Sequence, residues 1–239
     1  MRVAVLSDIH ANWHALEAVL EDARADAEDY LCLGDVVGYG GDPGRCLSHV
    51  ESNGWPTLVG NHDRACTDPQ ILAWFNEDAA TAIRWTIDEL TDEQLSWLAA
   101  LPEHGRTEGV LTVHASPRDP IYEYILDAGT AMANLLLVQD GLCFHGHTHV
   151  PGVFFFDAAG RVTHEYELGV LDLSGPMLVN PGSVGQPRDG DPDASYALWD
   201  TEAQTFEFRR VRYDVAAAQA AIREAGLPER FAARLEFGR

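Results

Sequence analysis

The stretch Arg2-Val-Ala-Val-Leu-Ser-Asp-Ile-His-Ala-Asn12 decides the fold of the first part of this chain. Residues 2–7 form a short, apolar run that favours a strand, and the polar residues that follow predict a loop at its end. Trp13, Leu16 and Val19 then recur at helical spacing, with Asn12 as the expected N-cap. This order of strand, polar loop and helix is typical of an α/β fold.

The same unit recurs in the next fifty residues. A strand is expected at Tyr30–Leu33, before the loop Gly34-Asp35, and a helix is expected between Pro43 and Ser52. A third strand around Thr57–Val59 ends in Gly60-Asn-His-Asp63. We therefore expect polar loops at the carboxyl ends of all three strands, where α/β proteins place their functional residues.

The later sequence changes from helical to strand-rich. Residues 69–100 are expected to be mainly helical, with a capping box at Thr91-Asp-Glu-Gln94. Strand signals then end at His114 and at Gly146, with a helix near Ala128–Val138 between them. From Val153 onward the pattern predicts antiparallel strands at Val153–Phe156, Val162–Leu168, Met177–Val179, Ser195–Trp199 and Thr205–Val211. A last helix is expected at Val215–Glu224. We expect one domain over residues 1–239 with two sheets, and residues 69–100 as a candidate cap over its site.

Composition narrows the function classes. The 239 residues carry a formal net charge of −22 and contain no lysine, which argues against nucleic-acid coating and against docking on anionic lipid. We see neither an apolar run of membrane-spanning length nor an apolar signal segment. The four cysteines are scattered and form no Cys-x-x-Cys pair, so we interpret them as buried thiols. A cytoplasmic location, with a small molecule as the partner, is the expectation.

Five predicted loops carry metal-binding or proton-transferring residues directly after a strand: Asp8/His10, Asp35, Asn61/His62, His114 and His147/His149. In an extended chain, residues i and i+2 point to the same side, so Asp8 and His10 are expected to converge, as are His147 and His149. The set offers two carboxylates, one amide oxygen and four imidazoles, with His62 as a further imidazole. Such a set suits two divalent ions that share a carboxylate.

Each of these signals has a structural alternative when it is taken alone. A single Asp-x-His pair or strand-end histidine is more often structural than metal-binding, and Gly34-Asp35 or Gly60-Asn-His-Asp63 could be an ordinary turn. The whole ordered set is much harder to explain by turns and packing, because each member follows its own predicted strand. We therefore favour a metal site over the structural alternative.

In this order the motifs resemble the signature of the calcineurin-like metallophosphoesterase superfamily, which reads D-x-H, GD, GNH[DE], H and GHxH. They stand here as Asp8-Ile-His10, Gly34-Asp35, Gly60-Asn-His-Asp63, His114 and Gly146-His-Thr-His149. The resemblance covers roughly residues 1–200 and looks closest to the small bacterial branch related to the YfcE-type phosphodiesterases and phosphatases, helped by Asn180-Pro-Gly-Ser183 and Gln186-Pro-Arg188. It implies two facing mixed β-sheets flanked by helices.

The resemblance also implies the ligands of two ions. Those of the first would be Asp8, His10, Asp35 and His149, and those of the second would be Asp35, Asn61, His114 and His147, with Asp35 bridging. His62 would be the catalytic histidine, and Asp63 would pair with it and orient it. Mixed nitrogen and oxygen ligands accept Mn, Fe, Co, Ni or Zn. Manganese is the choice for assays.

The expected reaction is hydrolysis of a small phosphodiester or phosphomonoester by a hydroxide that bridges the two ions, with His62 protonating the leaving alkoxide. The protein-phosphatase branch reads GDxVDRG, whereas residues 34–40 read Gly-Asp-Val-Val-Gly-Tyr-Gly and lack that arginine. Phosphoproteins and dinucleoside tetraphosphates are therefore less favoured as substrates. Two alternatives remain open, a non-catalytic scaffold subunit with the same fold and a metal-dependent nuclease.

Secondary contacts are less sharply defined by the sequence. Asn12 could bind a phosphate oxygen or cap a helix, and Arg64 could clamp phosphate or lie in solvent. Gly182-Ser183 and Arg188 could reach the site or form a turn, with the turn slightly favoured. The aromatic residues of the helical segment could roof the site, although core packing is favoured: Trp74, Phe75, Trp85 and Trp97.

Overall fold

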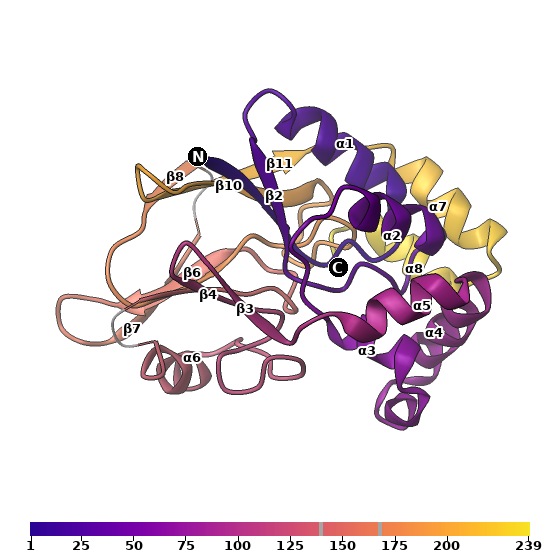
Figure 1. Cartoon of the computed structure of the whole chain (residues 1–239), viewed down its shortest axis with the longest axis horizontal. Coiled ribbons are helices and arrows are strands. Elements are labelled where there is room, and N and C mark those ends of the chain that lie inside the picture. Colours follow the sequence, from indigo (N-terminus) through magenta and orange to yellow (C-terminus); the bar gives the residue numbers. More distant parts are fainter. Residues whose placement is uncertain (139–140, 167–168) are drawn as a thin grey trace.

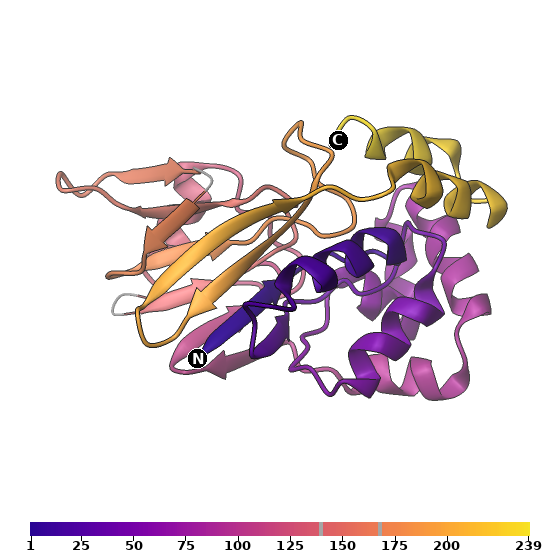
Figure 2. The ribbon, with the colours of Figure 1, turned by 90° about the horizontal axis from the view of Figure 1, so that it is seen from above.

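The computed structural model describes residues 1–138, 141–166 and 169–239. Within them, two β-sheets face each other and helices cover their outer faces (Figures 1 and 2). The first sheet has the strand order β2-β1-β10-β11-β8, and the second has the order β3-β4-β5-β9-β6-β7. The strands are β1 (Arg2–Leu6), β2 (Asp29–Cys32), β3 (His104–Thr107), β4 (Val110–Val113), β5 (Leu142–Phe144), β6 (Gly152–Phe156), β7 (Val162–Glu165), β8 (Gly169–Asp172), β9 (Met177–Asn180), β10 (Ala194–Asp200) and β11 (Thr205–Val211).

Both sheets mix parallel and antiparallel pairs. In the first sheet β1 is parallel to β2 and antiparallel to β10, and in the second β5 is parallel to β4 and β9. The helices are α1 (Trp13–Ala23), α2 (Pro43–Ser52), α3 (Asn61–Thr67), the 3₁₀ helix η1 (Pro69–Trp74), α4 (Glu77–Glu89), α5 (Asp92–Ala100), α6 (Ala128–Leu135), α7 (Val215–Glu224) and α8 (Glu229–Leu235). The expected fold class, two facing mixed sheets flanked by helices, is confirmed.

The residues of β1 show why the sheets are buried on both faces. Val3 and Val5 belong to the core between the two sheets, together with Phe144 of β5. Ala4 and Leu6 point to the opposite face and pack in the core that the N-terminal helices cover. Successive side chains of a strand alternate between faces, so a run that is apolar at every position must be covered on both sides.

Several local expectations need correction. Thr57–Val59 forms no strand, because only Thr57 makes a bridge with Cys32, and the Val59 N–H donates to the Pro102 carbonyl instead of a strand neighbour. Strand β9 lies antiparallel to β6 but parallel to β5. The expected strand Val162–Leu168 ends at Glu165 as β7, and its residues 167–168 lie outside the described residues. Strands β3 and β8 and helices α3 and α8 were not expected at all.

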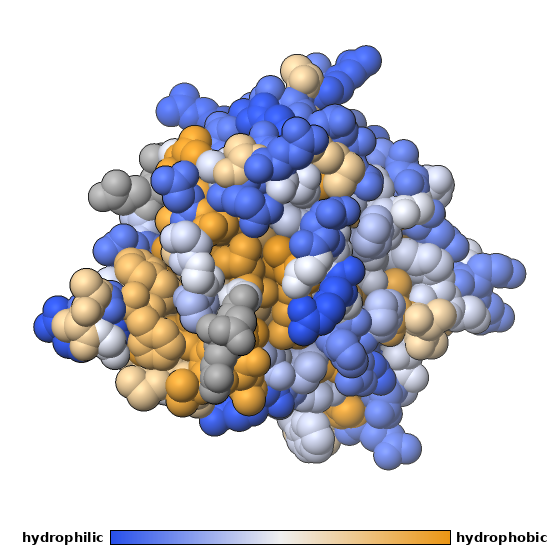
Figure 3. All heavy atoms as spheres, turned by 60° about the vertical axis from the view of Figure 1, so that its left-hand side comes forward, coloured by the Kyte–Doolittle hydropathy of each residue, from blue (hydrophilic) through white to orange (hydrophobic). Residues whose placement is uncertain are grey.

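Apolar surface gathers on the strand-rich side of the molecule. Figure 3 turns the left-hand side of Figure 1 forward, and hydrophobic residues occupy much of that face. Leu136, Leu137 and Val170 are among the exposed large hydrophobic side chains. Figure 1 places β7 and β8 on this side and α4 on the opposite side. Among the described residues, no helix has the length and apolar character required to cross a bilayer.

Candidate metal centre

The seven expected ligands come from strand ends of both sheets and from the start of α3. Asp8 and His10 follow β1, Asp35 lies in the loop after β2, and Asn61 is the first residue of α3. From the second sheet, His114 follows β4, and His147 and His149 follow β5. All seven side chains are buried. The centre therefore lies where the loops of the two sheets meet.

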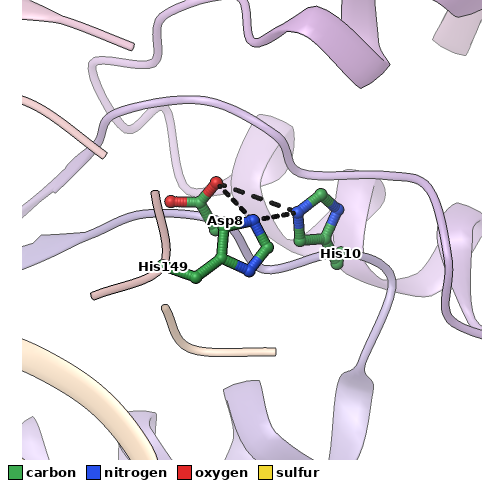
Figure 4. Close-up of side chains that lie close together, drawn as sticks. All are labelled: Asp8, His10 and His149. Carbon is green, nitrogen blue, oxygen red and sulfur yellow. Dashed lines mark hydrogen bonds and ion pairs between the residues drawn. The ribbon is translucent and has the colours of Figure 1, made fainter. Parts of the chain in front are cut away.

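One half of the centre is built around Asp8. Its Oδ1 oxygen lies 3.2 Å from the Nε2 atom of His149 and 3.8 Å from the Nε2 atom of His10. The two Nε2 atoms are 3.1 Å apart, and Figure 4 shows the three side chains pointing toward one another. The Nε2 atom of His10 also lies 3.6 Å from Oδ2 of Asp35.

The other half is built around His114. Its Nε2 atom lies 3.5 Å from Oδ2 of Asp35, 3.3 Å from Oδ1 of Asn61 and 3.2 Å from Nδ1 of His147. The same Oδ2 oxygen of Asp35 thus borders both halves. Asp8, His10 and His149 form one group that could hold a cation, and Asp35, His114 and His147 form another. A third group, His10, Asp35 and His62, lies between them.

Four backbone carbonyls fix which nitrogen of each histidine faces the centre. The ring nitrogens on the far side lie at hydrogen-bond distance from carbonyl oxygens, which only accept: Nδ1 of His10 at 3.1 Å from Val37, Nδ1 of His114 at 3.0 Å from Leu33, Nδ1 of His149 at 2.6 Å from Gln186, and Nε2 of His147 at 3.2 Å from Tyr122. In a neutral ring, the nitrogen that faces the centre then carries a lone pair. Burial lowers the pKa of His149 to about 4 and keeps the rings of His10 and His147 neutral in the same way. Metal-binding histidines are held by this kind of contact.

The carboxylates also leave acceptor oxygens directed at the centre. Oδ2 of Asp8 accepts hydrogen bonds from Ser7 Oγ at 2.6 Å and from the His147 N–H at 3.0 Å, whereas Oδ1 is buried and has no hydrogen-bond partner. Oδ1 of Asp35 accepts from the His62 N–H at 2.8 Å. Burial, with the nearby charges of Asp63 and Asp8, raises the pKa of Asp35 well above its usual range. A buried carboxylate oxygen without a donor and facing lone pairs fits a cation between them.

The backbone brings these side chains together in a different way from the one expected. The i and i+2 argument assumed extended chain, but five of the seven residues have a positive φ: Asp8 (54°), His10 (48°), Asp35 (54°), His147 (65°) and His149 (60°). The pairs do converge, through left-handed turns instead of strand alternation. Such conformations cost about 1–2 kcal/mol per non-glycine residue and concentrate at functional sites. Close packing adds to the constraint, since a Cβ atom on Gly60 would lie 2.0 Å from Oδ1 of Asp35.

His62 lies beside the centre, but the expected pairing with Asp63 is wrong. The His62 ring packs against Tyr39 at 4.3 Å and Phe75 at 5.1 Å between centroids, and its Nδ1 atom is buried without a partner. Burial, followed by the charge of Arg188, lowers the pKa of His62 well below its usual value. Asp63 instead accepts from the N–H groups of Asp35, Gly60 and Val37 at 2.7, 3.0 and 3.2 Å. It holds the loops that carry Asp35 and Asn61.

Asp63→Ala is therefore expected to act on stability. It leaves three buried N–H donors without an acceptor, at about 1–3 kcal/mol each, so the free energy of unfolding should fall by about 3 kcal/mol or more. Urea unfolding of chelator-treated protein measures this without a contribution from bound metal. Asp63→Asn keeps one acceptor oxygen and should lose less. An alanine variant within about 0.5 kcal/mol of the wild type would contradict this assignment.

The structure does not place Asn12 and Arg64 as substrate contacts. Asn12 caps α1 through its Oδ1 atom, which accepts from the Ala15 N–H at 3.1 Å, and its Nδ2 atom donates to the Gly185 carbonyl at 2.9 Å. The guanidinium of Arg64 donates to Glu103 at 2.8 Å. Asn12 therefore caps the helix, and Arg64 forms a partly exposed ion pair with Glu103.

A cavity of about 210 Å³ opens beside the centre. Its lining includes Asn61, His62 and His147 and five aromatic residues, Tyr39, Trp74, Phe75, Tyr122 and Tyr124. Trp74 and Phe75 thus border the site, whereas Trp97 packs against the helical core and Trp85 against α7 and α8. Sequence reasoning assigned no role to the three tyrosines. The segment around Tyr122 and Tyr124 carries no recognisable motif, and Tyr39 entered the comparison only as the residue that stands where the protein-phosphatase pattern has an arginine.

The late loop reaches the site, contrary to the favoured turn. Ser183 Oγ donates to the Asp8 carbonyl at 2.8 Å, and the Gln186 carbonyl accepts from His149. The guanidinium carbon of Arg188 lies 5.8 Å from the Tyr39 ring centroid, and the Nε atom of Arg188 is buried without a partner. The Nη2 atom of Arg188 donates to Oε1 of Gln186 at 2.9 Å. Arg188 is thus a positively charged group at the edge of the site, and its Nε donor has no partner among the described residues.

Comparisons with known proteins agree with this geometry. A family model described as the calcineurin-like phosphoesterase superfamily domain matches residues 1–204. An uncharacterized protein of Methanocaldococcus jannaschii is 37% identical over 243 residues, 99% of this chain and 98% of that protein. The crystal structure of a metallophosphoesterase from Sphaerobacter thermophilus is 45% identical with a TM-score of 0.90, covering 100% of this chain and 99% of that chain. A hypothetical protein from Pyrococcus horikoshii, 23% identical over 100% and 98% of the two chains, has the same fold with a TM-score of 0.81.

Proposed function

We propose that this chain, which belongs to the calcineurin-like phosphoesterase superfamily, is a dinuclear metal-dependent hydrolase of a small phosphodiester or phosphomonoester. The observation that carries the proposal is the position of Oδ2 of Asp35, 3.6 Å from His10 Nε2 and 3.5 Å from His114 Nε2. Asp8 and His149 complete the donor set on one side of this oxygen. Asn61 and His147 complete the set on the other side.

Two divalent ions held by these residues would activate a water as the nucleophile and neutralise charge on the phosphate oxygens. The protein's own residues supply the remaining functions. Asp35 is held through Oδ1 by the His62 N–H, which keeps Oδ2 at the shared position. The His62 ring lines the cavity next to Asn61 and His147. Its lowered pKa keeps the ring neutral in the protein alone; the negative charge of a phosphate bound on this floor would raise that pKa, and the imidazolium could then protonate the leaving oxygen.

Arg188 supplies the phosphate contact that Arg64 does not. Arg188→Ala is expected to lower kcat/KM by about 10- to 100-fold, mainly through KM, because it removes a charged hydrogen bond to substrate. Arg64→Ala is the matched control and should leave kcat/KM within about twofold of the wild type, since Arg64 is paired with Glu103. Steady-state kinetics with one ester measure both. A larger loss in the Arg64 variant would reverse the assignment.

The proposal is tested with purified protein, Mn²⁺ and bis(4-nitrophenyl) phosphate. We expect turnover that a chelator abolishes and added metal restores, together with two metal ions per chain by elemental analysis. Protein that holds both ions and turns over none of a panel of phosphomonoesters, diesters and cyclic nucleotides would support a scaffold subunit. Cleavage of single-stranded DNA or RNA in preference to the small esters would support a nuclease.

A further inference from the structure

The cavity beside the centre combines a metal-binding floor with aromatic walls. Asn61 and His147 form part of the floor. Trp74 and Phe75, at the end of η1, contribute one part of the wall, and Tyr122 and Tyr124, from the loop between β4 and α6, contribute another. The Tyr122 carbonyl also accepts from His147, so the backbone that positions this wall is tied to a candidate ligand.

Trp74 is an unusual residue for the rim of a cavity. It is 76% exposed, the largest value among the exposed large hydrophobic side chains of the described residues. Its ring meets the Tyr122 ring edge-on, with centroids 6.0 Å apart. The Tyr124 ring lies at 3.9 Å from His147, centroid to centroid. Exposed aromatic rings beside a concave site are typical of surfaces that bind another ring.

The wall carries no formal charge. The lining residues include no Arg, Lys, Asp or Glu, and Asn76 uses its Oδ1 atom to cap α4 by accepting from the Ala79 N–H. Five of the ten lining residues are aromatic, so ring surfaces are available to the alcohol part of an ester, and a flat ring can stack on them. The tyrosine hydroxyls and the amide groups of Asn61 and Asn76 add hydrogen-bonding groups beside these rings.

We propose that this cavity recognises a flat aromatic ring on the alcohol side of the ester, with a nucleoside as the biological class, and that Trp74 and Tyr122 are the specificity-determining residues. The inference rests on the proposed function, because it places the ester phosphate on the floor formed by Asn61 and His147. Stacking of a base on an aromatic side chain contributes a factor of about 5 to 150 in affinity, as measured by alanine substitution.

The first experiment measures binding without turnover. Saturation-transfer NMR with chelator-treated protein compares adenosine with ribose at equal concentration. We expect saturation of the adenine protons by the wild type and by Phe237→Ala, which removes an exposed aromatic ring outside the cavity, and a loss of signal in Trp74→Ala. Tyr122→Ala should act in the same direction, since it removes the ring that Trp74 meets. No adenine signal with the wild type, or equal signals from all variants, would overturn the inference.

The second experiment uses two phosphomonoesters that both leave through a primary 5-hydroxyl of ribose. Adenosine 5′-phosphate and ribose 5-phosphate differ at the base, and we expect kcat/KM about tenfold or more higher for the first, with the ratio near one in Trp74→Ala. Equal values in the wild type would refute the role of the ring while leaving hydrolysis established. Binding of adenosine by a protein that hydrolyses no ester would refute the proposed function and leave the ring site standing.

Discussion

Replacement of Asp35 by asparagine is expected to reduce phosphoester hydrolysis by about 10³-fold or more, because its Oδ2 oxygen belongs to both donor sets. Asparagine keeps the oxygen that accepts from the His62 N–H but removes the negative charge between the two cation positions. Elemental analysis should then find fewer than two ions per chain, and the thermal stabilisation that Mn²⁺ gives to the wild type should be largely lost.

The same variant separates metal binding from folding. Burial and the neighbouring carboxylates hold the pKa of Asp35 well above its usual range, so the ionised side chain is unfavourable in the protein without metal. Chelator-treated Asp35→Asn should therefore be at least as stable as chelator-treated wild type in urea. Asp88→Asn, an exposed change on α4, is the matched control and should alter neither property. Full metal content in Asp35→Asn would contradict a bridging role.

The second large effect is expected from His62→Ala. This side chain belongs to neither of the two proposed donor sets, although its ring also lies within 4.8 Å of ligand atoms of His10 and Asp35. We expect the variant to retain two ions per chain while losing hydrolysis. A proton donor contributes about 10²–10⁴-fold when the leaving group is a poor one. We therefore expect a loss of that size for an alkyl phosphate ester and a much smaller loss for a 4-nitrophenyl ester, whose leaving group needs little protonation.

The leaving-group comparison distinguishes two roles of His62. Equal losses on the alkyl and aryl esters would mean that the imidazole only positions phosphate. His104→Ala, in the exposed start of β3, is the histidine control and should change neither rate. Loss of metal from His62→Ala would show that the ring supports the centre, whose Asp35 it meets through the backbone N–H.

Much of the candidate metal centre could be predicted from the sequence, because its side chains belong to residue types that bind metal ions. Carboxylate, amide and imidazole side chains after predicted strands pointed to seven candidate ligands, and the structure brings these seven side chains together. The N-cap at Asn12 and the capping box at Thr91 were predictable for the same reason, since each depends on residues within three positions of one another. The strand expected at Thr57–Val59 is reduced to a single bridge, because the segment pairs only with Cys32 at the end of β2 and the Val59 N–H then donates to the Pro102 carbonyl.

The sequence by itself determined the fold class, the ordered set of metal-binding side chains and the superfamily to which the chain belongs. Tertiary structure alone decided which histidine nitrogens face the centre, that Asp63 holds backbone instead of His62, and that Arg188 lies at the edge of the site while Arg64 pairs with Glu103. The reason is physical. These features depend on backbone carbonyl and N–H groups, which every residue carries, and on distances between segments that are far apart in the chain. The type of a residue gives no information about either.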